Sequence, residues 1–330
     1  MKKPIYIFSD GELRRKDNTI YFENEDGKKY IPIENTSQIY MFGEVRINKR
    51  FLELLTQTEI VLHFFNRYDY YIGTYYPREH LNSGYMILRQ AEHYLNHNRR
   101  YLLARKFVRG SLKNIQQVIR YYRNRGKNVS ETEEKIKVME SKIPMCTCIE
   151  ELMAIEGNTR EYYYGSFDAI LGKRDFTFEK RTRRPPRNYL NTLISFGNSM
   201  IYTTVLAEIY KTHLDPRIGY LHATNFRRFT LNLDIAEIFK PIIVDRVIFT
   251  LISRGMITKN DFDRESGGII LKEKPKKTFI SEFENKLSST LSHSSLGRKV
   301  SYRRLIRLEL YKLQKHLMDE RKYEPYVARW

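Results

Sequence analysis

The chain has 330 residues, of which 41% are hydrophobic, and its 58 Lys and Arg against 39 Asp and Glu give a formal net charge of +19. The length suits about two domains, and the charge points to a polyanionic partner, either nucleic acid or an acidic membrane face. Cys146 and Cys148 are the only cysteines, which excludes a disulfide-built secreted scaffold and a zinc site made of cysteines alone. We therefore expect reduced thiols in a cytoplasmic protein.

Hydropathy gives no sign of a membrane protein. No apolar run reaches the roughly 18 residues of a membrane-spanning helix, and the first residues lack the apolar stretch of a signal peptide. We therefore expect nothing that spans a membrane and no membrane partner. The 25 Tyr among the Lys and Arg suit stacking on bases beside phosphate contacts, which favours nucleic acid.

The first 80 residues have the pattern of a β domain. Short runs rich in Ile, Tyr, Phe and Val are separated by turn signals at 9–11, 16–18 and 25–27. One helix is predicted among them, over 47–58. Short strands at this spacing predict a small sheet or sandwich.

The pattern changes near residue 82, where apolar residues begin to recur at three- and four-residue steps typical of helices. Helices are predicted over 149–171 and 188–214, separated by a basic loop that two prolines keep out of helix. A further helix over 234–255 is predicted to restart after Pro241, and 267–273 has the pattern of a small hairpin.

These elements predict an α+β chain with two parts of unequal size. A small, β-sandwich-like domain is expected over 1–80, a linker and first helix over 81–100, and a larger all-α domain over 101–330. The change from period-two to helical spacing places the boundary.

A histidine and two carboxylates lie close together in the segment 219–241. His222 ends a short apolar run, and Asp234 and Glu237 follow it. Asp234 and Glu237 are three positions apart, so on a helix they share one face. The plain alternative is a core histidine beside two acids that gain from the dipole at a helix N-terminus.

Glu156 is a third candidate because it follows the apolar run LMAI. A carboxylate buried there needs a partner or a cation, and one of the many arginines is the default partner. Together with Asp234 or Glu237 and His222, it would form a mixed oxygen and nitrogen site that suits Mg²⁺ or Mn²⁺, with water and phosphate oxygens completing the coordination. Such a site fits phosphodiester chemistry better than a structural metal.

These motifs resemble, in the same order and over nearly the whole chain, those of the CRISPR adaptation integrase family, the first CRISPR-associated protein (Cas-one). The segment IYIFSDGELRRKDNTIYF resembles the family's opening β segment, and IEGNTREYY resembles the motif of its metal-binding glutamate. LDPRIGYLH resembles the histidine motif and LNLDIAEIFKPIIVDR the carboxylate motif. The chain departs from the family at Lys240, where many members have Arg, and in HATN, which lacks the acid that usually follows the histidine.

The resemblance implies a metal-dependent DNA endonuclease and strand-transfer integrase. Such an enzyme inserts new spacer DNA into a CRISPR array when a 3′-hydroxyl attacks a phosphodiester of the repeat. Glu156, His222 and Glu237 are implied as catalytic ligands of Mg²⁺ or Mn²⁺, with Asp234 as a further ligand or as support for one. A homodimer formed through the β domain, double-stranded and branched DNA, and the small protein Cas-two are the implied partners.

Seven residues are candidates for DNA contact, each with a structural alternative. Arg160 could reach the scissile phosphate or pair with Glu156, tyrosines could touch DNA or pack in the core, and the loop arginines could grip phosphates or be solvated. The candidates are Arg160, Tyr163, Arg181, Arg183, Arg184, Arg187 and Tyr202. Two other functions stay open: a stand-alone metal-dependent nuclease acting on branched DNA or RNA, and a non-catalytic DNA-binding scaffold.

Overall fold

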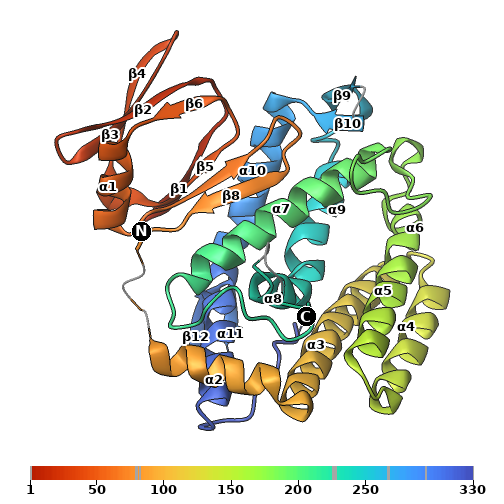
Figure 1. Cartoon of the computed structure of the whole chain (residues 1–330). Helices are drawn as coiled ribbons and strands as arrows, with labels where there is room; N and C mark the ends of the chain where they lie inside the picture. The colour runs from red at the N-terminus through yellow and green to blue at the C-terminus, as the bar shows by residue number, and fades with distance from the viewer. Residues whose placement is uncertain are drawn as a thin grey trace. The chain divides into compact units, whose positions relative to one another are not determined.

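The computed structural model describes residues 2–78, 81, 83–224, 229–265, 268–293 and 296–329. Two compact units divide the chain, Met1–Asn82 and Ser83–Trp330. Strands make up most of the first unit and helices most of the second (Figure 1), so the chain has the mixed α and β character that its sequence predicts. No helix among the described residues is long and apolar enough to cross a membrane.

The described residues of the first unit form two four-stranded sheets, one α-helix and one short 3₁₀ turn. One sheet has the order β1-β5-β7-β8, and the other has the order β4-β3-β2-β6. In the first sheet β1, β5 and β7 are parallel and β8 is antiparallel. In the second sheet β2, β3 and β4 form an antiparallel meander, and β6 joins β2 in parallel. The bounds are β1 Lys3–Ile7, β2 Gly11–Lys16, β3 Thr19–Asn24, β4 Gly27–Ile31, β5 Thr36–Met41, β6 Val45–Ile47, β7 Val61–Phe65, β8 Tyr71–Tyr75, η1 Ile33–Asn35 and α1 Lys49–Thr58.

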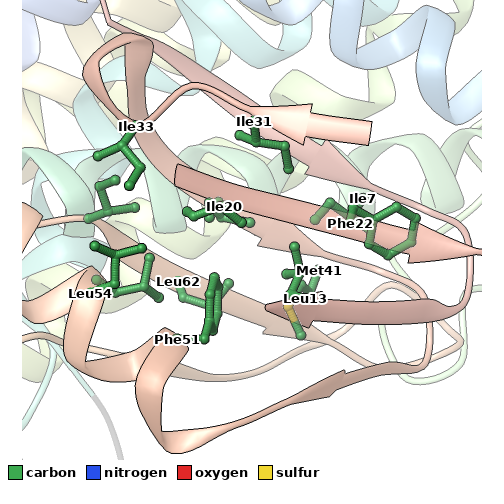
Figure 2. Packing of buried hydrophobic residues seen from close by; sticks show 13 residues of the cluster. Ile7, Leu13, Ile20, Phe22, Ile31, Ile33, Met41, Phe51, Leu54 and Leu62 are labelled. Atoms are coloured by element: carbon green, nitrogen blue, oxygen red, sulfur yellow. The ribbon is translucent and has the colours of Figure 1, made fainter. Parts of the chain in front are cut away.

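One apolar cluster joins both sheets to α1, as Figure 2 shows. Leu13 and Ile20 come from the second sheet and Leu62 from the first, and each is fully buried. Phe51 and Leu54 reach the same cluster from α1, because residues three positions apart share one face of a helix. Burying each of these side chains stabilises the unit by roughly 1.5–3 kcal/mol, so the cluster is its main source of stability.

The second unit is mainly helical. Its α-helices are α2 Gly84–Leu95, α3 His97–Arg123, α4 Ser130–Lys142, α5 Ile149–Gly165, α6 Phe167–Leu171, α7 Tyr189–Ile209, α8 Leu231–Phe239, α9 Arg246–Ser253, α10 Glu273–Ser288 and α11 Tyr302–Leu317. Short 3₁₀ turns lie at η2 Ile143–Met145, η3 Arg174–Phe176 and η5 Lys259–Asp261. A π-helical turn, η4 Pro241–Asp245, joins α8 to α9. The long helix α3 contacts both α5 and α8, so it supports the two helices that carry the candidate carboxylates.

The prediction of an all-α second part is wrong in detail, because this unit also contains two hairpins. Phe262–Glu265 (β9) pairs with Gly268–Leu271 (β10), and Thr290–His293 (β11) pairs with Arg298–Ser301 (β12). The first hairpin lies partly in the predicted stretch 267–273, although its first strand precedes that stretch and residues 266 and 267 lie outside the described residues. The second was missed because its four-residue strands show little alternation of apolar and polar side chains.

Candidate active site

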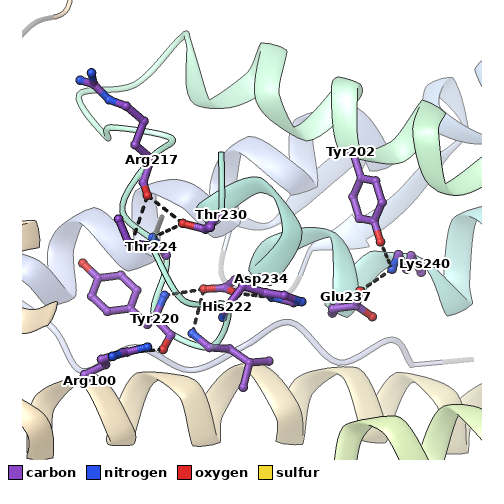
Figure 3. A network of polar contacts seen from close by, with 12 residues as sticks. Arg100, Tyr202, Arg217, Tyr220, His222, Thr224, Thr230, Asp234, Glu237 and Lys240 are labelled. Atoms are coloured by element: carbon purple, nitrogen blue, oxygen red, sulfur yellow. Dashed lines mark hydrogen bonds and ion pairs between the residues drawn. The ribbon is translucent and has the colours of Figure 1, made fainter. Parts of the chain in front are cut away.

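The helix α8 brings two candidate carboxylates into the interior. Asp234 is fully buried and Glu237 is 5% exposed, and both lie on the same helix as their spacing predicts. Figure 3 shows that their side chains serve separate groups of partners: Asp234 lies beside His222, and Glu237 lies beside Lys240. The two acids therefore have different roles.

Asp234 holds the chain around His222. Its Oδ2 accepts hydrogen bonds from the backbone N–H groups of Tyr220 at 2.6 Å and Leu221 at 3.1 Å. Its Oδ1 accepts from the backbone N–H of His222 at 3.0 Å and from the imidazole Nδ1 at 2.7 Å. Because both carboxylate oxygens are occupied in this way, Asp234 orients His222 and leaves the imidazole Nε2 as the nitrogen available to a ligand.

The imidazole of His222 is more basic than usual. Burial lowers the pKa of His222, but the hydrogen bond and the negative charge of Asp234 outweigh burial, so the pKa lies above its ordinary value. A metal-binding imidazole must be neutral. Binding of a cation at His222 should therefore weaken as the pH falls.

Arg160 connects the other two candidate ligands. It lies one helical turn beyond Glu156 on α5, and its Nε donates to Glu156 Oε1 at 3.1 Å. Its Nη2 donates to Glu237 Oε2 at 2.5 Å and to Ser111 Oγ at 3.2 Å. Arg160 is only 8% exposed, so this buried guanidinium forms ion pairs with both carboxylates.

Pro241 explains why Arg160 also reaches the backbone of α8. Proline has no N–H, so the helical hydrogen bond that would end at the carbonyl of Glu237, four residues earlier, is missing. Arg160 Nη2 donates to that carbonyl at 3.1 Å instead. The helical hydrogen bonds then resume with the five-residue spacing of a π-helix, in which the N–H of Asp245 donates to the carbonyl of Lys240 at 3.1 Å. The proline thus attaches α5 to α8 beside the carboxylates.

A second cation holds Glu237. Lys240 Nζ donates to Glu237 Oε1 and to the Tyr202 hydroxyl, and it lies 4.5 Å from the centre of the Tyr202 ring (Figure 3). Burial raises the pKa of Glu237, but the charges of Lys240 and Arg160 outweigh burial and hold it well below its usual range. Glu237 is therefore ionised at neutral pH.

Glu156 behaves in the opposite way. Burial and the negative charge of Glu237 raise its pKa, and the positive charges of Arg160 and Lys240 only partly oppose them. Two neighbouring carboxylates whose environments push their pKa values apart are typical of functional sites. A divalent cation between them would remove the repulsion and favour ionised Glu156.

The residues present fit a hard divalent cation by their chemistry. Glu156 and Glu237 offer carboxylate oxygens and His222 offers a neutral nitrogen, a set that suits Mg²⁺ or Mn²⁺. Within the part of the chain that the structure describes, however, no three His, Cys, Asp or Glu side chains are gathered as a metal-binding cluster. Arg160 and Lys240 hold the carboxylates instead. An ion would have to replace these two cations as the partner of the carboxylates.

The structure gives three of the candidate DNA contacts a partner or a place in the interior. Arg160 pairs with Glu156, Tyr202 holds Lys240, and Tyr163 is fully buried with its ring edge-to-face against Phe167, the centroids 5.0 Å apart. A side chain without exposed surface cannot touch DNA, so the alternative of core packing describes Tyr163.

The basic loop before α7 makes hydrogen bonds to α7 and to β10. Arg181 Nη1 donates to Asn191 Oδ1 at 2.9 Å, and the N–H of Ile269 in β10 donates to the carbonyl of Pro186 at 3.0 Å. The remaining three candidates in this loop are exposed; they are Arg183, Arg184 and Arg187. The loop therefore presents three of its four arginines to solvent.

Sequence reasoning missed two residues of this site. Lys240 entered only as a departure from a family pattern, although its position three residues after Glu237 places it on the same helical face. Asp245 was missed altogether, although an acid inside the apolar run PIIVDRVIF was a signal that could have found it.

The fold and these motifs define the chain's family. Residues 5–285 match the family described as CRISPR associated protein Cas1, and the chain belongs to this family. The resemblance drawn from its motifs is thereby confirmed.

Several relatives match along their whole length. The "CRISPR-associated endonuclease Cas1 2" of Thermodesulfovibrio yellowstonii is 61% identical over 330 residues, which cover 100% of both chains. A solved CAS1 protein from Thermotoga maritima is 50% identical, with a TM-score of 0.88 over 98% of this chain and 99% of that one. A casposase bound to integration product has a TM-score of 0.88 over 100% and 96% of the two chains, but at 17% identity it shares the fold alone.

Proposed function

We propose that this chain is a divalent-metal-dependent DNA endonuclease and integrase that inserts new spacer DNA into a CRISPR array. The observation that carries the proposal is that Arg160 joins Glu156 to Glu237 while Asp234 orients His222, whose imidazole also feels the negative charge of Glu237, in a chain of net charge +19. The names of the relatives from Thermodesulfovibrio yellowstonii and Thermotoga maritima, both CRISPR-associated endonucleases, support the assignment.

Glu156, His222 and Glu237 would hold Mg²⁺ or Mn²⁺. When bound, the ion would polarise a phosphodiester and stabilise the charge that develops as a 3′-hydroxyl attacks it. Asp234 keeps the imidazole in the tautomer whose Nε2 can bind, since its Oδ1 accepts a hydrogen bond from Nδ1–H. Arg160 and Lys240 orient the carboxylates until the ion arrives, and their positive charges keep Glu237 ionised.

The partners follow from charge and from relatives. The exposed Arg183, Arg184 and Arg187 would contact phosphates of double-stranded or branched DNA. Solved structures of the same fold include Cas6-RT-Cas1–Cas2 complexes, and we extend to this chain both a Cas2 partner and a homodimer built through the β domain. A cytoplasmic location is part of the proposal, since Cys146 and Cys148 are free thiols.

A strand-joining assay tests the proposal. Purified protein, with and without its Cas2 partner, is incubated with a labelled short duplex and repeat-bearing DNA in Mg²⁺ or Mn²⁺. We expect a longer labelled product that disappears in chelator and in the Glu156→Gln and His222→Ala variants. Glu161→Gln and His213→Ala are matched controls, because Glu161 is exposed on the same helix and His213 is exposed beyond α7.

The product distinguishes the remaining functions. Hydrolysis only shortens strands, so metal-dependent shortening without joining would identify a nuclease. DNA binding that persists in chelator, with no product under any condition and no effect of either variant, would leave a DNA-binding scaffold.

A further inference from the structure

Three buried polar atoms beside the candidate metal site lack hydrogen-bond partners. Within the described residues, Arg160 Nη1, Asp245 Oδ2 and the Tyr163 hydroxyl make no hydrogen bond. The Tyr163 hydroxyl lies near Asp245 and favours its ionised form, but their geometry falls short of a hydrogen bond. Buried groups of this kind are rare in native proteins, because each unmade bond is costly. A buried guanidinium nitrogen and a buried carboxylate oxygen, each without a hydrogen bond, call for an explanation.

Asp245 lies at the end of the π-helical turn that follows Pro241. It is 1% exposed, and the negative charge of Asp245 and the positive charge of Arg160 act on each other. The unusual backbone of this turn, which places Asp245 one residue out of the α-helical register, is the kind of irregularity that recurs at functional sites. Asp245 is thus a second acid within the electrostatic reach of Arg160.

Charge balance shows why a second acid matters. In this structure the two carboxylates of Glu156 and Glu237 stand against the two cations Arg160 and Lys240. A divalent ion that takes over the carboxylates would leave both cations buried beside it without their anions, which is strongly unfavourable. Arg160 would then need another acceptor, and the unpaired Oδ2 of Asp245 can accept a hydrogen bond from its unpaired Nη1.

We propose that Asp245 is a positioning residue that receives Arg160 when a divalent cation displaces the guanidinium from Glu156 and Glu237. The inference rests on the proposed metal site. It adds to that site a way in which the salt bridges of Arg160 with Glu156 and Glu237 can break when the ion binds. Asp245 touches neither the ion nor DNA; it acts by holding Arg160 away from the carboxylates.

The protonation of Asp245 supports this role. Burial raises its pKa to about 7, against the opposing charges of Arg160 and Lys240. Asp245 therefore carries a proton for much of the time while Arg160 stays with the glutamates, and it should lose that proton when Arg160 arrives. The titratable and charged groups that act on Asp245 are Arg160, Tyr163 and Tyr164 of α5 and Glu237 and Lys240 of α8 and its C-cap.

The test measures Mn²⁺ binding, without DNA, by titration calorimetry of the full chain and of Asp245→Asn, which keeps the shape and cannot ionise. We expect the variant to bind Mn²⁺ roughly 10- to 100-fold more weakly at pH 8, and the difference to shrink at pH 6. Titrations at pH 6 in two buffers with different ionisation enthalpies count the protons released, and the wild type should release up to about one more proton than the variant, because Asp245 is still mostly protonated there before Mn²⁺ binds.

A double variant shows whether Asp245 acts through Arg160. In an Arg160→Gln background, Asp245 has no guanidinium to bind. Adding Asp245→Asn to that background should therefore change Mn²⁺ affinity by less than about 2-fold. If Asp245→Asn is too unstable to purify, Asp245→Ser is the second variant, and it should show the same loss of Mn²⁺ affinity and of proton release.

The outcomes separate this inference from the proposed function. Equal Mn²⁺ affinity and equal proton release in wild type and Asp245→Asn, with binding lost in Glu237→Gln, would overturn the role of Asp245 and keep the metal site. A wild type that binds no Mn²⁺ would refute the metal site and with it the transfer of Arg160.

Discussion

Replacing Asp234 by Asn should destabilise the second unit, because Asn cannot accept all the hydrogen bonds that Asp234 accepts. The carboxylate accepts three backbone N–H bonds and one from the His222 ring. In the Asn variant one of the two oxygens becomes an NH₂ group, so two donors lose their acceptor and face another donor. The loss falls on Tyr220 and Leu221, or on the backbone and ring of His222, depending on which way the amide turns.

The magnitude follows from the burial of these groups. Asp234 and Tyr220 are fully buried, and each buried donor left unsatisfied costs about 1–3 kcal/mol. Two such donors therefore predict a loss of roughly 2–6 kcal/mol. The His222 imidazole would also lose the negative charge that raises its pKa, so that its pKa should fall in the variant.

Hydrogen exchange measured by mass spectrometry is the direct assay. Amide exchange of the peptide spanning residues 219–224 should accelerate by at least about tenfold in Asp234→Asn, which corresponds to 1.4 kcal/mol of local stability. Glu161→Gln, an exposed acid on α5, is the control and should leave exchange unchanged. An Asp234→Asn protein with wild-type exchange and wild-type unfolding midpoint would refute the reasoning.

Three further predictions concern packing, pH and DNA. Gly197→Ala should cost about 1–3 kcal/mol in denaturant unfolding, because an added Cβ would lie 2.4 Å from Val244 Cγ1. Wild type should lose stability relative to Asp245→Asn as the pH rises from about 4 to 7, measured by thermal unfolding: the folded pKa of about 7 exceeds the ordinary value, so protonation favours the fold below it. Arg183→Ala and Arg187→Ala should each reduce the salt dependence of DNA affinity by about one in log–log slope.

Two of these predictions have a control in the chain. Gly157→Ala places a methyl group where nothing lies within 4 Å, and in the helix α5 it should stabilise by roughly 0.5–1 kcal/mol. Arg181→Ala removes the bond to Asn191, so it should lower stability more than the exposed arginines do. A neutral Gly197→Ala, a flat difference between wild type and Asp245→Asn across pH, or an unchanged salt slope would contradict the respective prediction.

The different partners of Asp234 and Glu237 show what the spacing of residues along the sequence can and cannot predict. The three-residue spacing of Asp234 and Glu237 correctly placed both on one buried helix. The spacing could not predict that Asp234 accepts hydrogen bonds from the backbone of residues 220–222, or that Glu237 pairs with Arg160 and Lys240. Those partners come from segments that only tertiary folding brings together.

The sequence by itself determined the family, the β-then-helical order and the residues from which a site could be built, because periodicity and motif order are local properties of the chain. Tertiary structure decided which cations pair with those residues, that Tyr163 is buried, and that the charges of Asp245 and Arg160 act on each other. These depend on contacts between α5, α8 and the turn after Pro241. Burial then sets the pKa values, since desolvation and neighbouring charges act through space and not along the sequence.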